Sequence, residues 1–511
     1  MPPTIAPLAH RVLPRCSVSP TLAAASSLSC SSSSFSSLAS NAAAHGRAIH
    51  TSKQRPSPPM PASFDAAVTS TAQASTQAVG EQISAPSTPK KPSPLSVLPL
   101  SCILRSLMTT TVSSSPILLG PSMAIMTALA HSTNPLLNPD RNFVLRFFLK
   151  KTFYAQFCAG ENEREVRHTI DGLKAIGFRG VILGYAKEVV LKDEEKKNLA
   201  SFDAASRKEA TAEEIRAWAD GTLETVRLAA TCDFVALKFS GAGLEALADL
   251  ARQSPPSPAL ADAIDRICQL AVSRGVRLLF DAEQQAVQAG IDDWTMTYMR
   301  KYNTPERAVV FGTYQGYLKA SGAVLSEHLR QAREGGFALG VKLVRGAYLG
   351  SDPRQLIHDT KEDTDVAYDG MAEALLRRQW MAPLTPDSGA FPAVSLVVAS
   401  HNAASVERAQ AILASGTAAT TDVAFGQLQG MADEISCKLV LDAKSVQPAT
   451  KQADACVQAY KYLVWGSTGE CMKYLLRRAH ENRDAVERTR STRDAMVAEV
   501  LRRFKSVFGM A

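Results

Sequence analysis

The first 64 residues of the 511-residue chain contain no aspartate or glutamate, and the first acidic residue is Asp65. The same stretch carries five basic residues: Arg11, Arg15, Arg47, Lys53 and Arg55. They account for 5 of the formal net charge of +7, which leaves 7 − 5 = +2 for the rest of the chain. The basic balance is therefore a property of the N-terminus and gives no indication of nucleic-acid binding.

An acid-free, serine-rich N-terminus with scattered arginines is typical of an organelle transit peptide. The run R-A-I-H-T-S (residues 47–52) resembles a mitochondrial processing site, so we expect residues 1–52 to be a mitochondrial transit peptide. A disordered Ser/Ala-rich tail is the alternative. Residues 53–94 are rich in Pro, Ser, Thr and Ala and are expected to form a low-complexity linker.

Clustered cysteines and long hydrophobic runs are also lacking. The nine cysteines occur singly, without C-x-x-C, so structural zinc and a disulfide framework are poorly supported. Residues 95–131 are apolar-rich, but Arg105, several prolines and a Ser/Thr run interrupt them before the roughly 20 apolar residues of a membrane span. We expect packed helices over 95–150; peripheral membrane contact stays open.

Eight short apolar runs follow residue 150, and segments with helical periodicity separate them. The runs cover residues 181–185, 234–240, 276–283, 308–315, 340–348, 395–402, 423–431 and 462–466. Continuous apolar runs that alternate with helices indicate buried parallel strands. Eight such units predict an α/β fold, a (βα)8 TIM-like barrel over 151–485, with a C-terminal helix over 486–511. A doubly wound sheet is the alternative.

Polar residues gather at the carboxyl ends of these runs: Lys238, Asp281, Glu283, Gln315, Arg345, Tyr348, His401, Asn402 and Gln427. In a barrel of this kind those ends share one face, where the active site lies. Polar residues at strand ends in general could explain two or three of them, but not most of the eight runs. The sequence therefore predicts a ligand site on this face.

One glycine motif suggests a different cofactor. F-S-G-A-G-L-E-A (239–246) matches a dinucleotide fingerprint directly after a strand, which would fit an NAD-dependent enzyme. The following helix is broken by S-P-P-S-P, and Lys238 at the strand end is better placed to face a ligand. We interpret the glycines as a plain turn between strand and helix.

Charged residues inside two runs indicate ionic contacts. Asp281 and Glu283 share one side of a strand, which favours ion pairing; a metal site is the weaker alternative and none is predicted. Lys342 lies in an apolar strand and needs an acceptor. It shares a side with Tyr348, and Gly346 between them allows close backbone approach. This pattern fits an anionic or electron-rich cofactor.

The run Y-L-L-R-R-A-H-E-N (474–482) predicts a helix with an unusual face. Helical spacing aligns Tyr474 with Arg477 and Arg478, and aligns both arginines with Glu481. Paired arginines held by an anion make a bidentate site for a carboxylate or phosphate. An amphipathic surface helix is the alternative for this run taken alone.

The motifs T-F-Y-A-Q-F-C-A-G-E, F-D-A-E, T-Y-Q-G-Y-L-K, V-K-L-V-R-G-A-Y, S-H-N, F-G-Q-L-Q-G-M and Y-L-L-R-R-x-x-E-N together resemble the proline dehydrogenase (proline oxidase) family in its eukaryotic mitochondrial form. The resemblance covers roughly residues 95–485. It implies a barrel with the eighth helix over its mouth and FAD as cofactor. It further implies oxidation of L-proline to Δ1-pyrroline-5-carboxylate by hydride transfer from C5 to flavin N5. Electrons would pass to a membrane quinone on the matrix side of the mitochondrial inner membrane.

The resemblance also assigns site residues. Arg477 and Arg478 would bind the proline carboxylate, Leu428 would pack on its ring, and the pocket would be completed by Lys238, Asp281, Tyr348, Tyr462, Tyr474 and Glu481. The flavin would contact Gln315, Lys342, Gly346, Lys361, Thr364, His401, Asn402 and Gln427. Relatives that oxidise hydroxyproline carry a smaller residue at Tyr462, so proline is favoured over hydroxyproline. A catalytically silent metabolite-binding barrel is the alternative of another class.

Overall fold

The computed structural model of the chain describes residues 93–187, 208–420, 422–445, 458–481 and 486–509. The expected transit peptide and linker therefore lie outside the described residues. These described residues contain eight strands: β1 (Gly180–Tyr185), β2 (Phe234–Leu237), β3 (Arg277–Phe280), β4 (Val310–Gln315), β5 (Leu339–Val344), β6 (Val394–Ala399), β7 (Val423–Leu428) and β8 (Gln458–Trp465).

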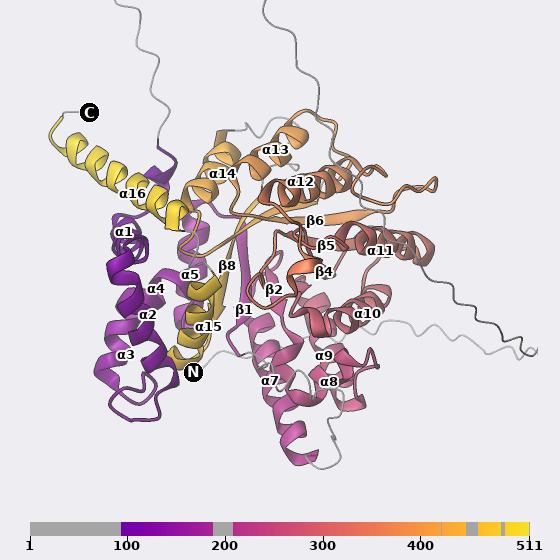
Figure 1. Cartoon of the computed structure of the whole chain (residues 1–511), viewed down its shortest axis with the longest axis horizontal. Helices are drawn as coiled ribbons and strands as arrows, with labels where there is room; N and C mark the ends of the chain where they lie inside the picture. The colour runs from indigo at the N-terminus through magenta and orange to yellow at the C-terminus, as the bar shows by residue number, and fades with distance from the viewer. Residues whose placement is uncertain (1–92, 188–207, 421, 446–457, 482–485, 510–511) are drawn as a thin grey trace, which may run out of the picture. The chain divides into compact units, whose positions relative to one another are not determined.

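These strands form a closed barrel in sequence order, and every neighbouring pair is parallel (Figure 1). Ile182 of β1 pairs with Phe234 of β2 on one side and with Tyr462 of β8 on the other, so β8 closes the sheet onto β1. The predicted (βα)8 barrel is confirmed, and the doubly wound alternative is wrong. The last strand begins at Gln458, four residues before the apolar run that predicted it.

Helices surround this barrel: α5 (Glu163–Ile176), α7 (Lys208–Leu228), α8 (Leu244–Ala251), α9 (Pro258–Arg274), α10 (Gln285–Tyr302), α11 (Ser321–Gly335), α12 (Lys361–Arg377), α13 (Ala403–Ala414), α14 (Asp433–Ser445), α15 (Thr468–Glu481) and α16 (Val486–Val507). Their boundaries follow local rules. Thr360 and Asp363 form a capping box that begins α12. Gly275 and Gly336, with φ of 68° and 65°, end α9 and α11 in the left-handed conformation that glycine adopts without steric cost.

The segment before the barrel is helical, as expected over 95–150. It contains η1 (Pro94–Val97), α1 (Leu100–Ser114), α2 (Pro116–His131), α3 (Phe143–Leu149), the π-helical turn η2 (Lys150–Tyr154) and α4 (Ala155–Phe157). We call residues 94–157 the N-terminal layer. Helix α1 of this layer packs on α16, and helix α2 packs on α15, so the layer covers one side of the barrel (Figure 1).

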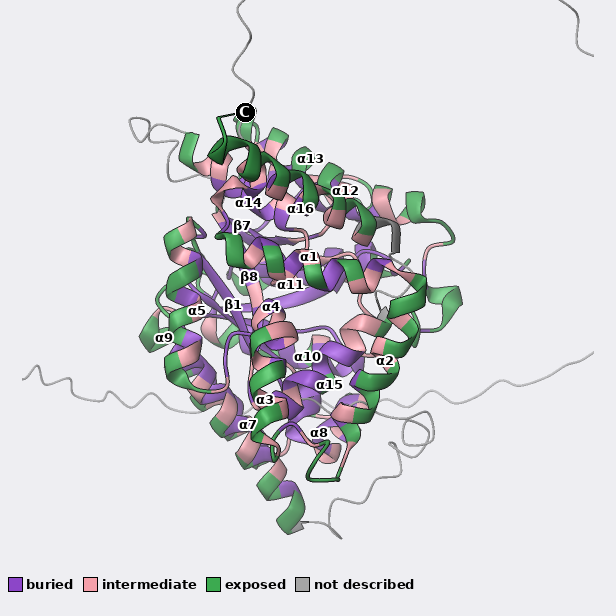
Figure 2. Cartoon of the chain, turned by 90° about the vertical axis from the view of Figure 1, so that its left-hand side faces the viewer, coloured by how far each residue is buried: buried purple, intermediate pink, exposed green. Residues whose placement is uncertain are grey.

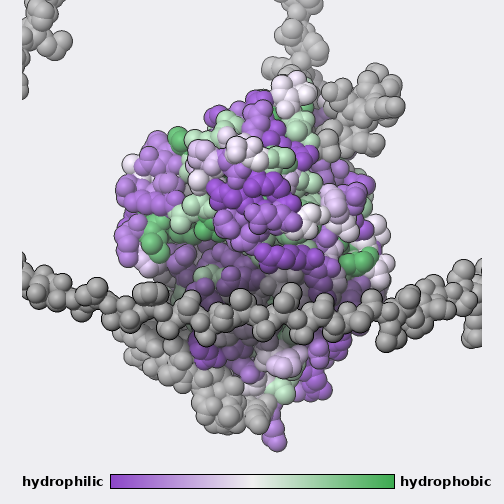
Figure 3. Space-filling model, turned by 90° about the vertical axis from the view of Figure 1, so that its right-hand side faces the viewer, coloured by the Kyte–Doolittle hydropathy of each residue, from purple (hydrophilic) through white to green (hydrophobic). Residues whose placement is uncertain are grey.

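The two sides of the molecule differ in surface character. Exposed positions run along α1, α2 and α3 on the side that the N-terminal layer covers (Figure 2). On the opposite side, hydrophilic side chains dominate the surface that is not hidden by grey atoms, and apolar patches are small and scattered (Figure 3).

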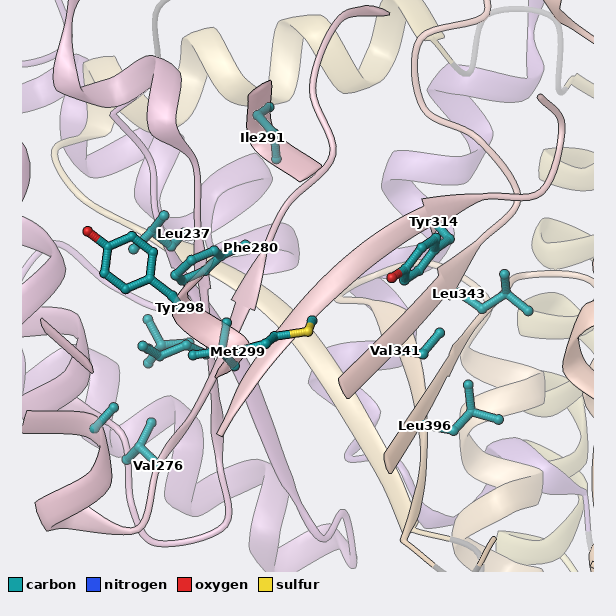
Figure 4. Packing of buried hydrophobic residues seen from close by; sticks show 14 of the residues in the cluster. Leu237, Val276, Phe280, Ile291, Tyr298, Met299, Tyr314, Val341, Leu343 and Leu396 are labelled. Atoms are coloured by element: carbon teal, nitrogen blue, oxygen red, sulfur yellow. The ribbon is translucent and has the colours of Figure 1, made fainter. Parts of the chain in front are cut away.

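Alternation along each strand divides the core into two parts. Phe234 of β2 points into the barrel, where it meets Phe311 and Tyr460 edge-on with ring centroids 5.6 and 5.2 Å apart. Residues of the opposite parity, such as Phe280 and Leu343, pack outward against the helices (Figure 4). Full burial of an aromatic or aliphatic side chain contributes roughly 1.5–3 kcal/mol, so this double layer is the main source of stability. It holds the strand ends rigidly.

A polar cluster interrupts the outer core where α10 and α11 pack over β4. The Tyr314 hydroxyl lies 2.8 Å from His328 Nδ1, and Gln288 Nε2 donates to Asp292 Oδ1 at 2.9 Å. Burial raises the pKa of Asp292 to about 7 and lowers the pKa of His328 to about 4. Both groups are therefore held in their neutral forms over a wide pH range.

Replacing Asp292 with Asn should change how stability depends on pH. The folded chain holds the Asp292 proton up to about pH 7, whereas an unfolded chain releases it near pH 4. The folded state binds more protons between those values, so the free energy of unfolding falls as pH rises through them. The Asp292→Asn variant has no carboxyl group to ionise, so its free energy of unfolding should not fall in this way. At pH 8 it should exceed that of the parent by on the order of 1–4 kcal/mol, and near pH 4 the two should be similar. Urea unfolding at pH 5 and pH 8 measures the effect. Asp293→Asn, at an exposed neighbouring position, is the control. Equal pH slopes in the Asp292→Asn variant and the parent would contradict the assignment.

Candidate active site

A buried ion pair marks the carboxyl end of the barrel. Lys342 on β5 and Asp281, the first residue after β3, are 7% and 6% exposed, and Lys342 Nζ donates to Asp281 Oδ1 at 2.5 Å. The other carboxylate oxygen accepts from the Tyr462 hydroxyl at 3.3 Å, and Lys342 Nζ lies 5.4 Å from the Tyr462 ring centroid. An isolated buried lysine or aspartate would be costly, so each of the two charges requires the other.

The two carboxylates expected side by side have different partners. Both follow β3, which ends at Phe280. Asp281 binds Lys342, whereas Glu283 Oε1 accepts from the Ser240 backbone N–H at 3.0 Å. Within the described residues, no group of three or more His, Cys, Asp or Glu side chains is placed to hold a metal ion.

The face of α15 that carries Tyr474 meets this end of the barrel. Tyr474 is buried, and its ring centroid lies 5.9 Å from Lys238 Nζ and 5.7 Å from the Arg478 guanidinium carbon. Arg477 and Arg478 are partly buried near the end of the helix. Two cationic groups thus face one aromatic ring, which attracts cations through its π face. Glu481 ends α15, but its side chain lies outside the described residues.

A cavity of about 150 Å³ joins α15, the barrel end and the N-terminal layer. Four of the predicted substrate residues line it: Leu428, Tyr462, Tyr474 and Arg478. The N-terminal layer contributes a largely apolar wall, which includes Met123, Met126, Phe153 and Phe157. The pattern of polar strand ends did not predict this wall. The only sequence indication of this wall was the T-F-Y-A-Q-F-C-A-G-E motif, which contains the two phenylalanines.

Several predicted cofactor residues lie around the ends of β4 to β7. Gln315 is buried; its Oε1 accepts from the Ala347 N–H at 3.0 Å, and its Nε2 is one of the buried nitrogens in the described chain that have no hydrogen-bond acceptor. His401 Nε2 accepts from the Leu428 N–H at 3.0 Å, so that nitrogen carries no proton when the bond is made. Gln427 Nε2 donates to the Ser400 carbonyl at 3.3 Å.

Gly346 and Tyr348 follow β5. A Cβ at Gly346 would lie 2.5 Å from the Tyr317 ring, so this position accepts no side chain unless Tyr317 moves. The Tyr317 hydroxyl in turn donates to Asp352 at 2.6 Å. Tyr348 is buried, and its carbonyl accepts from two following backbone N–H groups. The close packing fixes this loop beside the ion pair.

Lys361, Thr364 and Asn402 lie at the first turns of α12 and α13. Lys361 Nζ donates to Asp365 at 2.6 Å, Thr364 Oγ1 donates to the Thr360 carbonyl at 3.3 Å, and Asn402 Oδ1 caps α13. Burial alone would raise the pKa of Asp365, but hydrogen bonds from Lys361 and Arg345 outweigh it and hold that pKa below its ordinary value. Lys361 and Arg345 therefore share one carboxylate in the first turns of α12, and the N-termini of α12 and α13 lie on the side of the barrel where an anionic group could meet their backbone N–H groups.

The glycine turn after β2 is packed against protein. Residues 239–242 form a buried 3-10 turn, and a Cβ at Gly241 would lie 2.7 Å from the Trp218 ring. At Gly243, with φ of 101°, a Cβ would overlap the Glu214 carboxylate. Both partners belong to α7. The glycines are a turn between strand and helix, as interpreted from the sequence.

Two carboxylates of distant residues hold the N-terminus of α15. Asp140 Oδ1 accepts from the Gly469 N–H at 2.8 Å, and Glu161 Oε1 accepts from the Thr468 N–H at 2.9 Å and its hydroxyl at 2.6 Å. Burial alone would raise the pKa of Glu161, but bonds from Lys150 and Thr468 hold it below its ordinary value. Negative charge at a helix N-terminus is stabilising. Sequence reasoning missed this arrangement.

Comparison with known proteins identifies relatives. The sequence model of a family described as proline dehydrogenase matches residues 166–491. A probable mitochondrial proline dehydrogenase of Schizosaccharomyces pombe is 32% identical over 409 residues, which are 71% of this chain and 81% of that protein. Hydroxyproline dehydrogenase of Mus musculus is 28% identical over 396 residues, 70% of this chain and 82% of that protein.

Among solved structures, proline utilization A from Bdellovibrio bacteriovorus, inactivated by N-propargylglycine, matches with a TM-score of 0.52 and 15% identity. The match covers 75% of this chain and 38% of that one, so this likeness concerns the fold alone. The family match begins at Val166, so the N-terminal layer with Asp140, and Glu161 that follows it, lie outside the match.

Asp140→Ala should destabilise α15, because a hydrogen-bond acceptor and a negative charge at its N-terminus are lost. We expect a decrease in the free energy of unfolding of about 1–2 kcal/mol and faster amide exchange over 468–473. Asp140→Asn keeps an acceptor oxygen and should lose less. Asp171→Ala, at an exposed position on α5, is the control. Equal exchange over 468–473 in Asp140→Ala and in the parent would show that the carboxylate does not hold the helix.

Proposed function

Because this chain belongs to the proline dehydrogenase family and is a proline dehydrogenase enzyme, we propose that it oxidises L-proline to Δ1-pyrroline-5-carboxylate with FAD and passes the electrons to a membrane quinone. The observation that supports this most is the cavity that brings Leu428, Tyr462, Tyr474 and Arg478 together beside the Lys342–Asp281 pair. These residues come from three separate elements, and strand-end position alone would not gather them.

Arg477 and Arg478 are proposed to bind the substrate carboxylate. Guanidinium groups bind carboxylates through paired, charge-assisted hydrogen bonds. Lys238 adds a third cationic group within 5.9 Å of the Tyr474 ring, and Tyr474 packs between it and Arg478. The negative end of proline would therefore bind against α15, and the aliphatic ring would extend toward Leu428 and Tyr462.

The residues around the ends of β4 to β7 fit a flavin. The Nε2 of buried Gln315, which has no acceptor within the described chain, offers a donor to a cofactor, and Lys342 supplies a buried positive charge. Gly346, Lys361, Thr364, His401, Asn402 and Gln427 would complete the contacts. When bound, FAD supplies a two-electron acceptor that takes a hydride from proline C5.

Residues of the chain would also control the amine of the substrate. Loss of hydride from C5 builds positive charge at the ring nitrogen, so a strong acid near that nitrogen would oppose the reaction. Both Asp281 oxygens already accept hydrogen bonds, from Lys342 and from Tyr462. Leu428 and the Tyr462 ring would exclude water. Proline would bind with its amine deprotonated, and no catalytic base is required.

The location is proposed from the relatives and the N-terminal composition. Proline dehydrogenases of Schizosaccharomyces pombe and Dictyostelium discoideum are named mitochondrial. We assign residues 1–52 as a transit peptide, 53–94 as a linker and 486–511 as a C-terminal helix. The enzyme would act on the matrix side of the mitochondrial inner membrane, in peripheral contact with it.

Anaerobic titration of the purified chain with L-proline tests the reaction. The flavin absorbance should be bleached without added nicotinamide; absence of flavin would instead favour a silent metabolite-binding barrel.

Arg477→Met should retain flavin but raise the Kd of L-proline about 10- to 100-fold, because a charge-assisted hydrogen bond contributes roughly 1.5–3 kcal/mol. L-prolinamide, which lacks the carboxylate, should lose much less affinity. Arg490→Met, at an exposed position on α16, is the control. Unchanged proline affinity in Arg477→Met would show that the carboxylate assignment is wrong.

Tyr462 is expected to decide between proline and its hydroxylated form. Tyr462→Ser removes the ring that limits the cavity and should raise the ratio of kcat/KM for 4-hydroxyproline to that for proline by about tenfold, equivalent to about 1.4 kcal/mol. Tyr462→Phe keeps the bulk, loses the bond to Asp281 and should leave this ratio near that of the parent. Steady-state kinetics with both substrates measures the change. An equal ratio in the Ser and Phe variants would argue against a size limit at this position.

A further inference from the structure

The N-terminal layer exposes an unusual amount of apolar surface. More than half of the large apolar side chains that the described residues expose lie between Leu100 and Phe148. Their core is a group on α2, α3 and the connection between them, which we call the docking face: Ile117, Leu118, Ile125, Leu136, Leu137, Phe143, Val144, Phe147 and Phe148. Phe143 and Phe148 are 70% and 66% exposed. Leaving so many large apolar side chains in water is unfavourable, and their concentration on these elements marks an interaction surface.

The charges around the docking face have one sign. Between residues 93 and 160 the only acidic residue is Asp140, and its carboxylate is turned toward the N-terminus of α15. Arg141 and Lys151 flank α3 and are exposed, and Lys151 Nζ lies 5.9 Å from the Phe147 ring centroid. Apolar side chains with a basic border and this lack of acidic residues are complementary to an anionic lipid surface.

Two exposed hydroxyls, one on α1 and one on α2, bond to their own backbone. Thr111 Oγ1 donates to the Leu107 carbonyl at 2.7 Å, and Thr127 Oγ1 donates to the Met123 carbonyl at 2.8 Å. Both residues face away from the protein, where water would satisfy a hydroxyl equally well. Bonds of this kind leave no polar hydrogen to be satisfied when the helix surface enters a lipid environment.

The geometry favours binding along a membrane rather than across it. No single helix among the described residues is long and apolar enough to span a bilayer; α1 and α2 reach that length and composition only together, and they are bent by 102° at Ser115. Their other sides pack on α16 and α15. Such helices lie in the interface with their apolar side chains in the headgroup and acyl boundary.

We propose that the docking face binds the surface of an anionic phospholipid bilayer, with Phe143, Phe147 and Phe148 inserted and Arg141 and Lys151 at the headgroups. A protein partner or a second copy of the chain fits the charges less well, because neither supplies a uniformly anionic surface over an apolar interior. The docking face lies outside residues 166–491, which the family model matches.

The docking face lies close to the cavity at the barrel mouth. The inner side of α2 lines the cavity at the barrel mouth through Met123 and Met126, so one helix separates the cavity from the proposed bilayer. A lipid-soluble acceptor could then enter from the membrane without crossing water. Lipid binding by the docking face assigns a surface to the peripheral membrane contact proposed above, and the entry of an acceptor rests in addition on the proposed reaction.

Flotation of the full chain with lipid vesicles tests the proposal. The chain should float with vesicles of phosphatidylcholine containing about 20% cardiolipin and bind pure phosphatidylcholine much less. The triple variant Phe143→Ser, Phe147→Ser, Phe148→Ser should lower the partition coefficient at least about tenfold, because each phenyl ring buries substantial apolar area. Arg141→Gln with Lys151→Gln should lower binding to the anionic vesicles and reduce its salt dependence. Val272→Ser with Val366→Ser, at exposed apolar positions on α9 and α12, is the control and should bind as the parent does.

Two further measurements separate the possible outcomes. L-proline oxidation with a soluble dye should be unchanged in the triple variant, so loss of lipid binding is distinguished from failure of the proposed reaction. Phe147→Trp should add fluorescence that brominated lipid quenches, which tests insertion without removing apolar side chains. Equal flotation of the triple variant and the parent would overturn the proposal, as would added fluorescence in the Phe147→Trp variant that brominated lipid does not quench. The proposal would also be overturned if the parent chain bound neither kind of vesicle and formed a dimer through this face.

Discussion

The hydrogen-bonded closure of β8 onto β1 is the constraint on which the rest of the structure depends. It brings residues 180–185 beside residues 460–465 and so turns eight successive units into a closed surface with all strand ends on one side. Lys238, Asp281, Gln315, Lys342 and Tyr462 come from five different strands or strand ends, and only closure makes them neighbours. The same closure directs the chain into α15 at the place where its tyrosine meets Lys238. An open sheet with these residues would spread them along an edge.

Buried charge has a different meaning beside the cavity and in the rest of the barrel. Arg277 reaches Asp422 at 3.0 Å and the Tyr460 hydroxyl at 3.3 Å, and Lys461 reaches Asp433 at 2.7 Å; these pairs connect strands to neighbouring loops and helices. The Lys342–Asp281 pair instead lies beside a cavity and shares Tyr462 with it. Desolvating two charges is expensive, and apolar residues of similar volume would serve stability equally well. The position of this pair is therefore better explained by what it offers to a ligand than by stability.

The fold could be predicted from the sequence because strands covered on both faces are apolar along their whole length, which makes all eight visible. The error at β8 has the same origin: Gln458 and Lys461 interrupt the apolar pattern, and Lys461 is buried only because Asp433 pairs with it. The gathering of site residues was predictable from the geometry of barrels. The capping of α15 was not, since Asp140 and Glu161 bind its N-terminus from more than 300 positions away. No local periodicity reports such a contact.

The capping of α15 by Asp140 and Glu161 has a consequence for the life of the protein before it is folded. A chain made from its N-terminus presents the two carboxylates early and the helix they hold almost last. Until the final strand has closed the barrel, those carboxylates have no helix to bind and the paired arginines have no fixed direction. A nascent chain therefore lacks the arrangement that a substrate would recognise. The substrate pocket is thus withheld until the last helix has formed, by topology and without a dedicated inhibitor.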